Sequence, residues 1–157
     1  MPTLLFLFLA CSQAPDSAEP VAVRVAAGEV CTQLDAVSVS DLWGLPGRDE
    51  PGATDEVRIR VLAGHPDWAT RCTVNRMGGM DVGPSCELTG ATQTQAEAVY
   101  AAVERDFRSC HAGWMLMDEA DETTREVVAE KDGAIRFVRI RDNAERGWQV
   151  SIGAMPL

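Results

Sequence analysis

Near residue 110 of this chain, the spacing of apolar residues changes from a helical to an alternating pattern. Before that point, five apolar side chains recur three or four positions apart, which predicts one amphipathic helix with a single buried stripe: Ala96, Val99, Tyr100, Val103 and Phe107. After it, apolar and polar residues alternate, as in half-buried strands. One helix followed by strands with short connections predicts an α+β fold, in which the helix packs on one face of an antiparallel sheet.

The start of this helix carries a capping signature. Thr94 and Glu97 stand three residues apart before the apolar stripe, and such a pair satisfies free backbone N–H groups at a helix N-terminus. Cys110 continues the stripe, so we expect its thiol to face the core, and we expect the helix to end near Ser109.

The strongest hairpin signal follows the helix. Asp132 and Gly133 separate two alternating segments, 123–130 and 134–141, and an Asp-Gly pair tolerates the positive φ that tight hairpin turns require. Residues 31–43 fit either a strand or a broken helix, and residues 44–54 predict a loop. Further strands are predicted at 21–26, 57–63, 70–77, 85–90, 114–118 and 148–152, so we expect a sheet of five to seven strands.

The five cysteines limit which disulfide bonds the chain can form. If Cys11 is set apart, an even number remains, namely Cys31, Cys72, Cys86 and Cys110, and their long, irregular gaps favour two disulfides over a metal site. Four cysteines allow three connectivities. We favour Cys72–Cys86, which flank a Gly/Pro-containing connection, together with Cys31–Cys110.

The N-terminus has the features of an export signal. Residues 4–10 form an apolar run that is far shorter than the roughly 20 residues needed to span a bilayer. Ala10 and Cys11 follow, and then a polar stretch with two prolines. This order resembles the signal peptide of bacterial lipoproteins. The resemblance implies a signal peptide at 1–10, a lipidated Cys11, a flexible tether at 11–20 and a single α+β domain at 21–157.

The same resemblance implies a location. In that family a residue other than Asp after the cysteine permits sorting to the outer membrane, and Ser12 fits this rule. We therefore expect a lipid-anchored protein of the cell envelope that faces the periplasm. An ordinary cleaved secretory signal, with Cys11 incidental, is the alternative.

The charge of the chain argues against two classes of partner. A formal net charge of −10 and a pI near 4.6 do not fit binding to nucleic acid or electrostatic attachment to anionic lipid, because both need a basic face. Attachment to a membrane would then depend on the acyl chains at Cys11.

Catalytic signals are few. His65 and Asp67 stand two residues apart in a predicted loop, where they resemble half of a general-base system, but a simple turn explains them better. His111 lies at the expected helix end, where a cation interacts well with the helix dipole.

Metal and cofactor signals are also weak. Met115 and Met117 share one strand face, which favours core packing over copper ligation. Asp118, Glu119 and Asp121 belong to an acidic stretch that lacks the pattern of a calcium loop. Nothing in the sequence requires a cofactor.

Two tryptophans are the best candidates for ligand binding. Trp43 and Trp68 lie in predicted loops, and large aromatic rings on loops often anchor contacts with a partner. The function we predict is therefore an envelope binding module, whose partner is an envelope protein or a peptidoglycan-related ligand. Two alternatives remain: a small hydrolase that uses His65 with Asp67, or His111, and a structural spacer.

Overall fold

The computed structural model describes residues 24–37 and 42–155. The predicted signal peptide, Cys11 and the tether lie outside the described residues. So does most of the strand predicted at 21–26, and its described residues 24–26 are not in a strand.

The described chain forms one antiparallel sheet of eight strands with two α-helices, which confirms the α+β class but exceeds the five to seven strands predicted. The sheet order is β1-β2-β3-β4-β8-β7-β6-β5. The strands are β1 (Gly47–Asp49), β2 (Val57–Leu62), β3 (Arg71–Met77), β4 (Met80–Ala91), β5 (Met115–Ala120), β6 (Thr124–Lys131), β7 (Ala134–Asn143) and β8 (Gly147–Met155).

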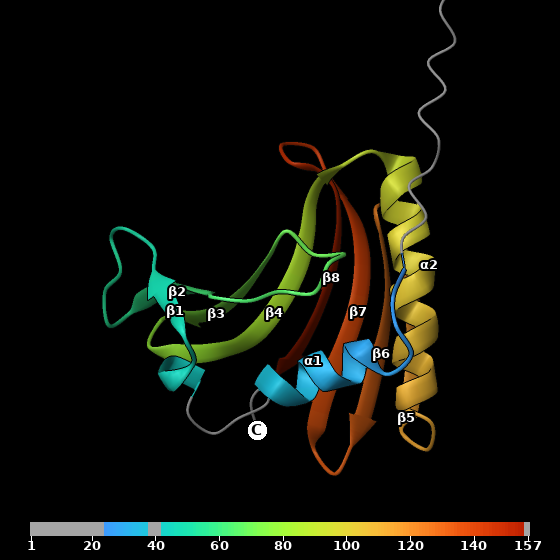
Figure 1. Cartoon of the computed structure of the whole chain (residues 1–157), viewed down its shortest axis with the longest axis horizontal. Helices are drawn as coiled ribbons and strands as arrows, with labels where there is room; N and C mark the ends of the chain where they lie inside the picture. The colour runs from blue at the N-terminus through green and yellow to red at the C-terminus, as the bar shows by residue number, and fades with distance from the viewer. Residues whose placement is uncertain (1–23, 38–41, 156–157) are drawn as a thin grey trace, which may run out of the picture.

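Two four-stranded meanders build this sheet. β1–β4 form the first and β5–β8 the second, and the long strand β4 joins them by pairing with β8. Helix α2 (Gln93–Cys110) connects β4 to β5. Both helices pack against the second meander, whereas β1–β3 extend away from them (Figure 1).

Helix α2 buries the predicted stripe. Ala96, Val99, Tyr100, Val103 and Phe107 are all buried, which confirms the helical spacing. Its capping box, however, begins two residues before the predicted one.

The N-cap of α2 is Thr92, whose side chain accepts a hydrogen bond from the backbone N–H of Gln95, while the Gln95 side chain accepts one from the backbone of Thr92. The prediction of Thr94 with Glu97 is therefore wrong. The sequence offers two threonines with the same spacing to Gln or Glu. Because β4 ends at Ala91, the first of them still has the extended backbone that an N-cap requires.

The ambiguous segment 31–43 is mostly helical where it is described. Helix α1 (Glu29–Val37) packs on α2, and a short 3₁₀ turn, η1 (Leu42–Gly44), follows. The carboxylate of Asp106, on α2, accepts hydrogen bonds from the backbone N–H groups of Gly28 and Val30 at 2.7 and 2.9 Å. A side chain of α2 thus caps the start of α1, a long-range contact that local sequence does not reveal.

Both favoured disulfides are present. Cys72 and Cys86 are direct partners on β3 and β4, and Cys31 joins α1 to Cys110 at the end of α2. The second bridge therefore fixes the two helices to each other.

The turn between β6 and β7 is also as predicted. Asp132 and Gly133 both have positive φ, of 51° and 84°, and the strands pair directly on either side of them. The extra strand β1 lies inside the predicted loop at 44–54, where three residues pair with β2. So short a strand leaves too little alternation to be recognised in the sequence.

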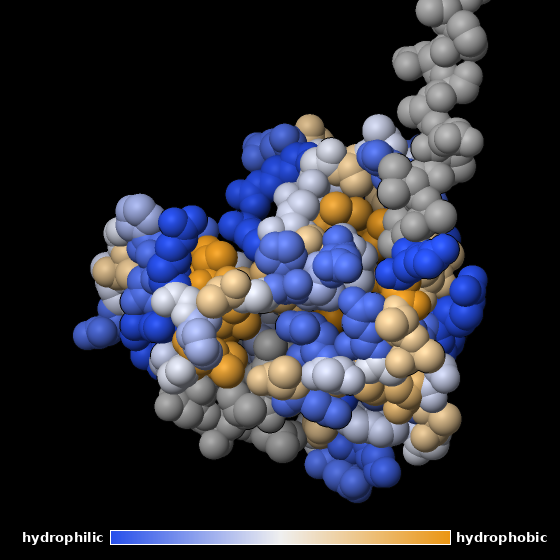
Figure 2. All heavy atoms as spheres, in the orientation of Figure 1, coloured by the Kyte–Doolittle hydropathy of each residue, from blue (hydrophilic) through white to orange (hydrophobic). Residues whose placement is uncertain are grey.

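The core lies between the helices and one face of the sheet. The sheet residues that pack there alternate along four neighbouring strands and include Cys86, Val127, Val138, Ile140, Val150 and Ile152. Within residues 24–37 and 42–155, no helix covers the opposite face of the sheet, which we call the helix-free face. The side of the molecule that carries α1 is largely covered by hydrophilic side chains (Figure 2).

Candidate functional site

An irregularity in β4 creates a depression on the helix-free face. Between two paired positions, β4 has two residues, Thr89 and Gly90, where β8 has only Gln149. Such a bulge bends the strand and is common beside binding sites. Gly90 adopts a φ of +71°, which side chains rarely tolerate, so glycine suits this position.

The depression is open and has a volume of about 550 Å³. Its lining comes from five parts of the chain, namely the β1–β2 connection, β2, the start of β3, the bulge of β4 and the β7–β8 turn, and consists of Glu50, Ile59, Thr70, Arg71, Thr89, Gly90 and Arg146. We call this the bulge depression.

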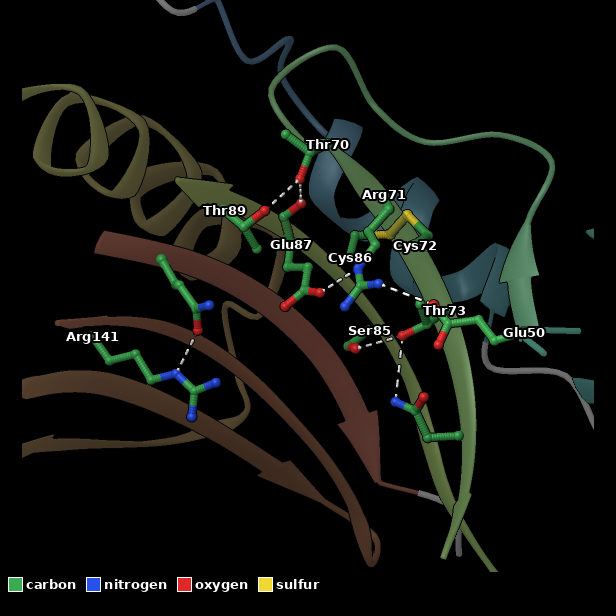
Figure 3. A network of polar contacts seen from close by, with 12 residues as sticks. Glu50, Thr70, Arg71, Cys72, Thr73, Ser85, Cys86, Glu87, Thr89 and Arg141 are labelled. Carbon is green, nitrogen blue, oxygen red and sulfur yellow. Dashed lines mark hydrogen bonds and ion pairs between the residues drawn. A yellow bond between two sulfur atoms is a disulfide. The ribbon is translucent and has the colours of Figure 1, made fainter. Parts of the chain in front are cut away.

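Arg71 organises one wall of the bulge depression. Its Nε donates to Glu87 Oε1 at 2.6 Å, and its Nη1 donates to Glu50 Oε1 at 3.3 Å (Figure 3). Thr70 donates from Oγ1 to the backbone carbonyl of Glu87 at 2.9 Å. Both carboxylates on this wall are therefore held by the same guanidinium.

Gln149 lies opposite the bulge, on the same face, and is only 2% exposed. Its Oε1 accepts a hydrogen bond from Arg141 Nε at 2.8 Å, but its buried Nε2 has no hydrogen-bond partner. An unpaired buried donor costs roughly 1–3 kcal/mol. Nε2 of Gln149 is therefore an unused donor that is covered by the surrounding protein.

Arg139 is a second residue of this face with an unused donor. Its Nη2 donates to both carboxylate oxygens of Glu126, at 2.8 and 3.0 Å, and its guanidinium lies over the Phe137 ring. Its buried Nε has no partner. Arg139 and Gln149 lie on neighbouring strands, so two unused donors occur on adjacent parts of the helix-free face.

Two exposed arginines stand near these donors without a carboxylate partner among the described residues. Arg141 uses Nε for Gln149, and Arg146 has no side-chain hydrogen bond or ion pair within residues 24–37 and 42–155. Since most arginines of the sheet are paired with acids, an unpaired guanidinium at this site is available for a ligand.

Trp43 and Trp68 occupy different environments. Trp43, in η1, is half-buried, and its ring contacts the guanidinium groups of Arg58 and Arg76. Its Nε1 donates to Asp81 at 3.0 Å. The hydrogen bond from Arg76 is the main reason that the pKa of Asp81 lies below its ordinary value, and Trp43 adds to the effect. The Trp43 ring thus contacts two arginines, and its N–H group is already paired.

Trp68 belongs to the hydrophobic core and is 5% exposed. Its loop position in sequence suggested an accessible ring, but the ring is buried in the core cluster. The role of Trp43 in recognition remains a prediction, whereas the burial of Trp68 removes the exposure on which its role depended.

The structure does not bring His65 and Asp67 together. His65 is exposed and its Nδ1 contacts the carbonyl of Pro66, and no hydrogen bond or ion pair joins it to Asp67 in the described chain. Among the described residues, His65 and Asp67 are therefore not arranged as the pair that the hydrolase alternative requires.

His111 is a buried structural residue with both ring nitrogens engaged. Its Nδ1 lies 2.7 Å from the carbonyl of Phe107, and its Nε2 lies 3.5 Å from Arg136. Arg136 also forms an ion pair with Asp35 at 2.7 Å and lies over the Trp114 ring. This cluster joins both helices to β7.

The sulfurs of Cys31 and Cys110 and a ring nitrogen of His111 lie within 4.8 Å of one another, the spacing of a potential metal site. The two sulfurs are joined as a disulfide, however, and a metal requires thiolates. This group therefore does not fit a metal ion in the oxidised protein.

The acidic stretch 118–122 is only partly the turn that the simpler interpretation proposed: residues 118–120 end β5, and the turn to β6 begins at Asp121. Asp121 accepts backbone hydrogen bonds from Thr123 and Thr124, and these bonds hold the pKa of its carboxyl below the ordinary value.

The prediction that Met115 and Met117 pack in the core is wrong, because their side chains are 54% and 36% exposed. They do share a strand face, but it is the helix-free one.

Sequence reasoning did not identify the bulge depression. One signal was present: Gly90 stands within an alternating strand pattern, which often marks a bulge. The depression combines Thr89 and Gly90 of β4 with Arg146 of the β7–β8 turn, which requires the pairing of β4 with β8, and these strands are distant in sequence.

Comparison with known proteins finds no match: no protein-family model fits the chain, and neither a curated protein nor a solved structure is significantly similar to it. Among the described residues, no helix combines the length and the apolar character needed to cross a bilayer. The functional argument therefore depends on the geometry of the chain itself.

Proposed function

We propose that this protein is a lipid-anchored binding module of the cell envelope, and that it captures its ligand at the bulge depression. The observation that carries the proposal is the guanidinium of Arg146, which lines an open depression and has no side-chain partner among the described residues. The buried Gln149, with its unused donor, lies opposite the β4 bulge. Unsatisfied buried polar groups are rare in native structures and call for an explanation.

The groups at the depression favour binding over covalent chemistry. Its accessible polar atoms are mainly N–H donors and hydroxyls, and its two carboxylates, on Glu50 and Glu87, are engaged by Arg71. A hydroxyl becomes a nucleophile only beside a free base. The hydroxyl of Thr70 instead donates to a backbone carbonyl, so the lining is equipped to hold a ligand.

The membrane attachment is proposed from the sequence. The apolar run at 4–10, Ala10 before Cys11, and the pairing of the other four cysteines in disulfides all support lipidation of Cys11. Two or more acyl chains would give stable anchoring. The polar stretch at 11–20 would then separate the domain from the outer membrane.

Crosslinked capture from native membranes, with the partner identified by mass, tests the proposal. We expect Arg146→Gln combined with Gln149→Leu to abolish capture, and Arg105→Gln, a change at an exposed arginine of α2, to leave it intact. Circular dichroism and thermal melting verify that each variant is folded. Capture that survives the double change would refute the assignment of the depression.

The anchor is tested separately by membrane fractionation. Replacing Cys11 with Ala should release the protein into the soluble fraction. If the Cys11→Ala variant still sediments with membranes after a high-salt wash, the lipid anchor is refuted, whatever the result of the capture experiment.

A further inference from the structure

We propose that the open edge of β5 binds an extended segment of another protein, which adds to the sheet as a further strand and carries apolar residues next to basic ones. This surface is separate from the bulge depression, so the inference goes beyond the proposed function and does not depend on it. It follows from the outward backbone groups of β5, the apolar side chains beside them and the charges on the strand.

The backbone of β5 has an unused edge. β5 is the last strand of the sheet order and, among the described residues, pairs only with β6. The N–H of Asp121 donates to the carbonyl of Thr124 at the start of the β5–β6 turn. Every second residue of an antiparallel pair exchanges such bonds, so the backbone groups of Leu116, Asp118 and Ala120 point away from β6. A row of outward N–H and C=O groups is a template for another strand.

Apolar side chains extend from this edge across the helix-free face. The strand register aligns them in two neighbouring rows that cross β5, β6, β7 and β8. Contiguous exposed apolar side chains mark interaction surfaces, and the flexible methionine side chain adapts to a partner. Three of the side chains are methionines that are 54%, 36% and 50% exposed, in chain order. We call the set the methionine patch: Met115, Met117, Val128, Ile135, Phe137 and Met155.

The charges on β5 favour a partner with basic residues. The strand contains two carboxylates, on Asp118 and Glu119, and no basic residue. Arg108 binds Asp118, whereas Glu119 is exposed and has no side-chain partner within residues 24–37 and 42–155. Glu119 also lies directly opposite Glu126 on β6, and like charges in that position destabilise a sheet. A basic side chain on the other side of Glu119 would offset this repulsion.

The same charges argue against a second copy of this chain at the edge. Antiparallel pairing along the whole of β5 would place Asp118 opposite Met117 of the other copy and Glu119 opposite Leu116. Four carboxylates would then lie in neighbouring rows with no basic residue of β5 between them. Charges on an edge strand are a common means of preventing such self-association. The occupant that fits is therefore a strand of different sequence.

The register of β5 defines a probe peptide. Acetyl-Thr-Lys-Lys-Ile-Thr-Val-amide, laid antiparallel to β5, places its two lysines opposite Glu119 and Asp118, its isoleucine opposite Met117 and its valine opposite Met115. One control peptide has glutamate in place of both lysines. A second control keeps the sequence but is methylated on the backbone nitrogen of the second lysine, which would otherwise donate to the outward carbonyl of Asp118.

Backbone NMR titration of the whole chain with these peptides tests the inference. We expect the lysine peptide to shift the amide signals of Leu116, Asp118 and Ala120 in a saturable manner, and each control peptide to bind at least about tenfold more weakly. No saturable shift, or equal binding by the methylated peptide, would overturn strand addition. Shifts of the same signals that grow with protein concentration, without peptide, would overturn it in favour of a second copy.

Charge reversal tests the role of the carboxylate. Glu119→Lys should weaken binding of the lysine peptide by about tenfold and strengthen binding of the glutamate peptide. Glu56→Lys makes the same change of charge at an exposed residue before β2, towards the other edge of the sheet, and should alter neither. Equal effects of the two variants would show a general charge effect and refute recognition at β5.

A double variant tests the methionine patch. Met115→Thr combined with Met117→Thr should weaken binding of the lysine peptide by about tenfold, because the isoleucine and valine lose their apolar contacts. Both side chains are exposed and threonine suits a strand, so the fold should persist, which thermal melting verifies. Unchanged affinity in the folded variant would refute the apolar part of the docking surface.

Discussion

The ring Nδ1 of His111 donates a hydrogen bond to the backbone carbonyl of Phe107, one helical turn earlier, at 2.7 Å. A carbonyl only accepts, so the proton is on Nδ1, and Nε2 is left to face Arg136. Burial is the main cause that lowers the pKa of His111 below its ordinary value of 6.5, and the nearby Arg136 lowers it further. The folded state therefore binds a proton at this histidine less readily than the unfolded chain does.

A pH dependence of stability follows from this depressed pKa. Below about pH 6.5 the unfolded chain binds a proton at His111 before the folded chain does, so the free energy of unfolding decreases as the pH falls. The slope is at most about 1.4 kcal/mol per pH unit from this one group. Urea unfolding at a series of pH values measures it.

His111→Gln is the control for that experiment. This change removes the titrating group, and His65 is present in both proteins, so the difference between their pH curves isolates His111. We expect the variant to lose less stability than the parent as the pH falls below 6.5. Parallel curves would show that the pKa of His111 is not depressed.

The chain contains one tyrosine, so its ionisation can be followed without interference. Burial, and then the charge of Glu104, raise the pKa of Tyr100 from 10.0 to about 12. Above pH 10 the unfolded chain loses the phenolic proton first, so this contribution to stability is lost as the pH rises toward 12. Ultraviolet titration of native and denatured protein should show the two midpoints. A native midpoint near 10 would contradict the burial of the phenol.

The face of α2 that packs against the sheet can be tested with two neighbouring positions. Phe107 is fully buried, so Phe107→Ala should reduce the free energy of unfolding by about 3–5 kcal/mol. Arg105 is exposed on the same helix, so Arg105→Ala should change it by less than about 0.5 kcal/mol. Denaturant unfolding compares the two, and similar losses would mean that the helical face is misassigned.

The two disulfides should differ in their contributions to stability. Cys31–Cys110 joins residues 79 positions apart and Cys72–Cys86 residues 14 apart. In the chain-entropy description, their removal costs about 4.5 and about 3 kcal/mol respectively. Paired replacements by alanine, followed by urea unfolding, measure both losses. A larger loss for the short loop would show that native packing, rather than chain entropy, dominates.

Local sequence determined the elements whose signals lie within a few neighbouring residues. The buried stripe from Ala96 to Phe107 required only helical spacing, and the turn at Asp132 and Gly133 required only residues that accept positive φ. The pairing of Cys72 with Cys86 likewise followed from a short connection between two adjacent strands.

Longer-range packing decided the features that sequence alone did not reveal. Thr92 rather than Thr94 caps α2 because β4 extends to Ala91, and the carboxylate of Asp106 caps the start of α1 from another helix. Trp68 is buried in the core although its loop position suggested an accessible ring. The bulge depression exists only because β4 pairs with the last strand of the sheet.

Met115 and Met117 illustrate what local sequence predicts and what depends on tertiary packing. Alternation determined that they share one face of β5, and they do. Whether that face is buried depends on where the helices pack, and both helices cover the opposite face. The sequence by itself therefore determined which residues lie together on each element. Only the tertiary structure decided which faces are covered, because burial is a property of contacts between segments that are distant along the chain.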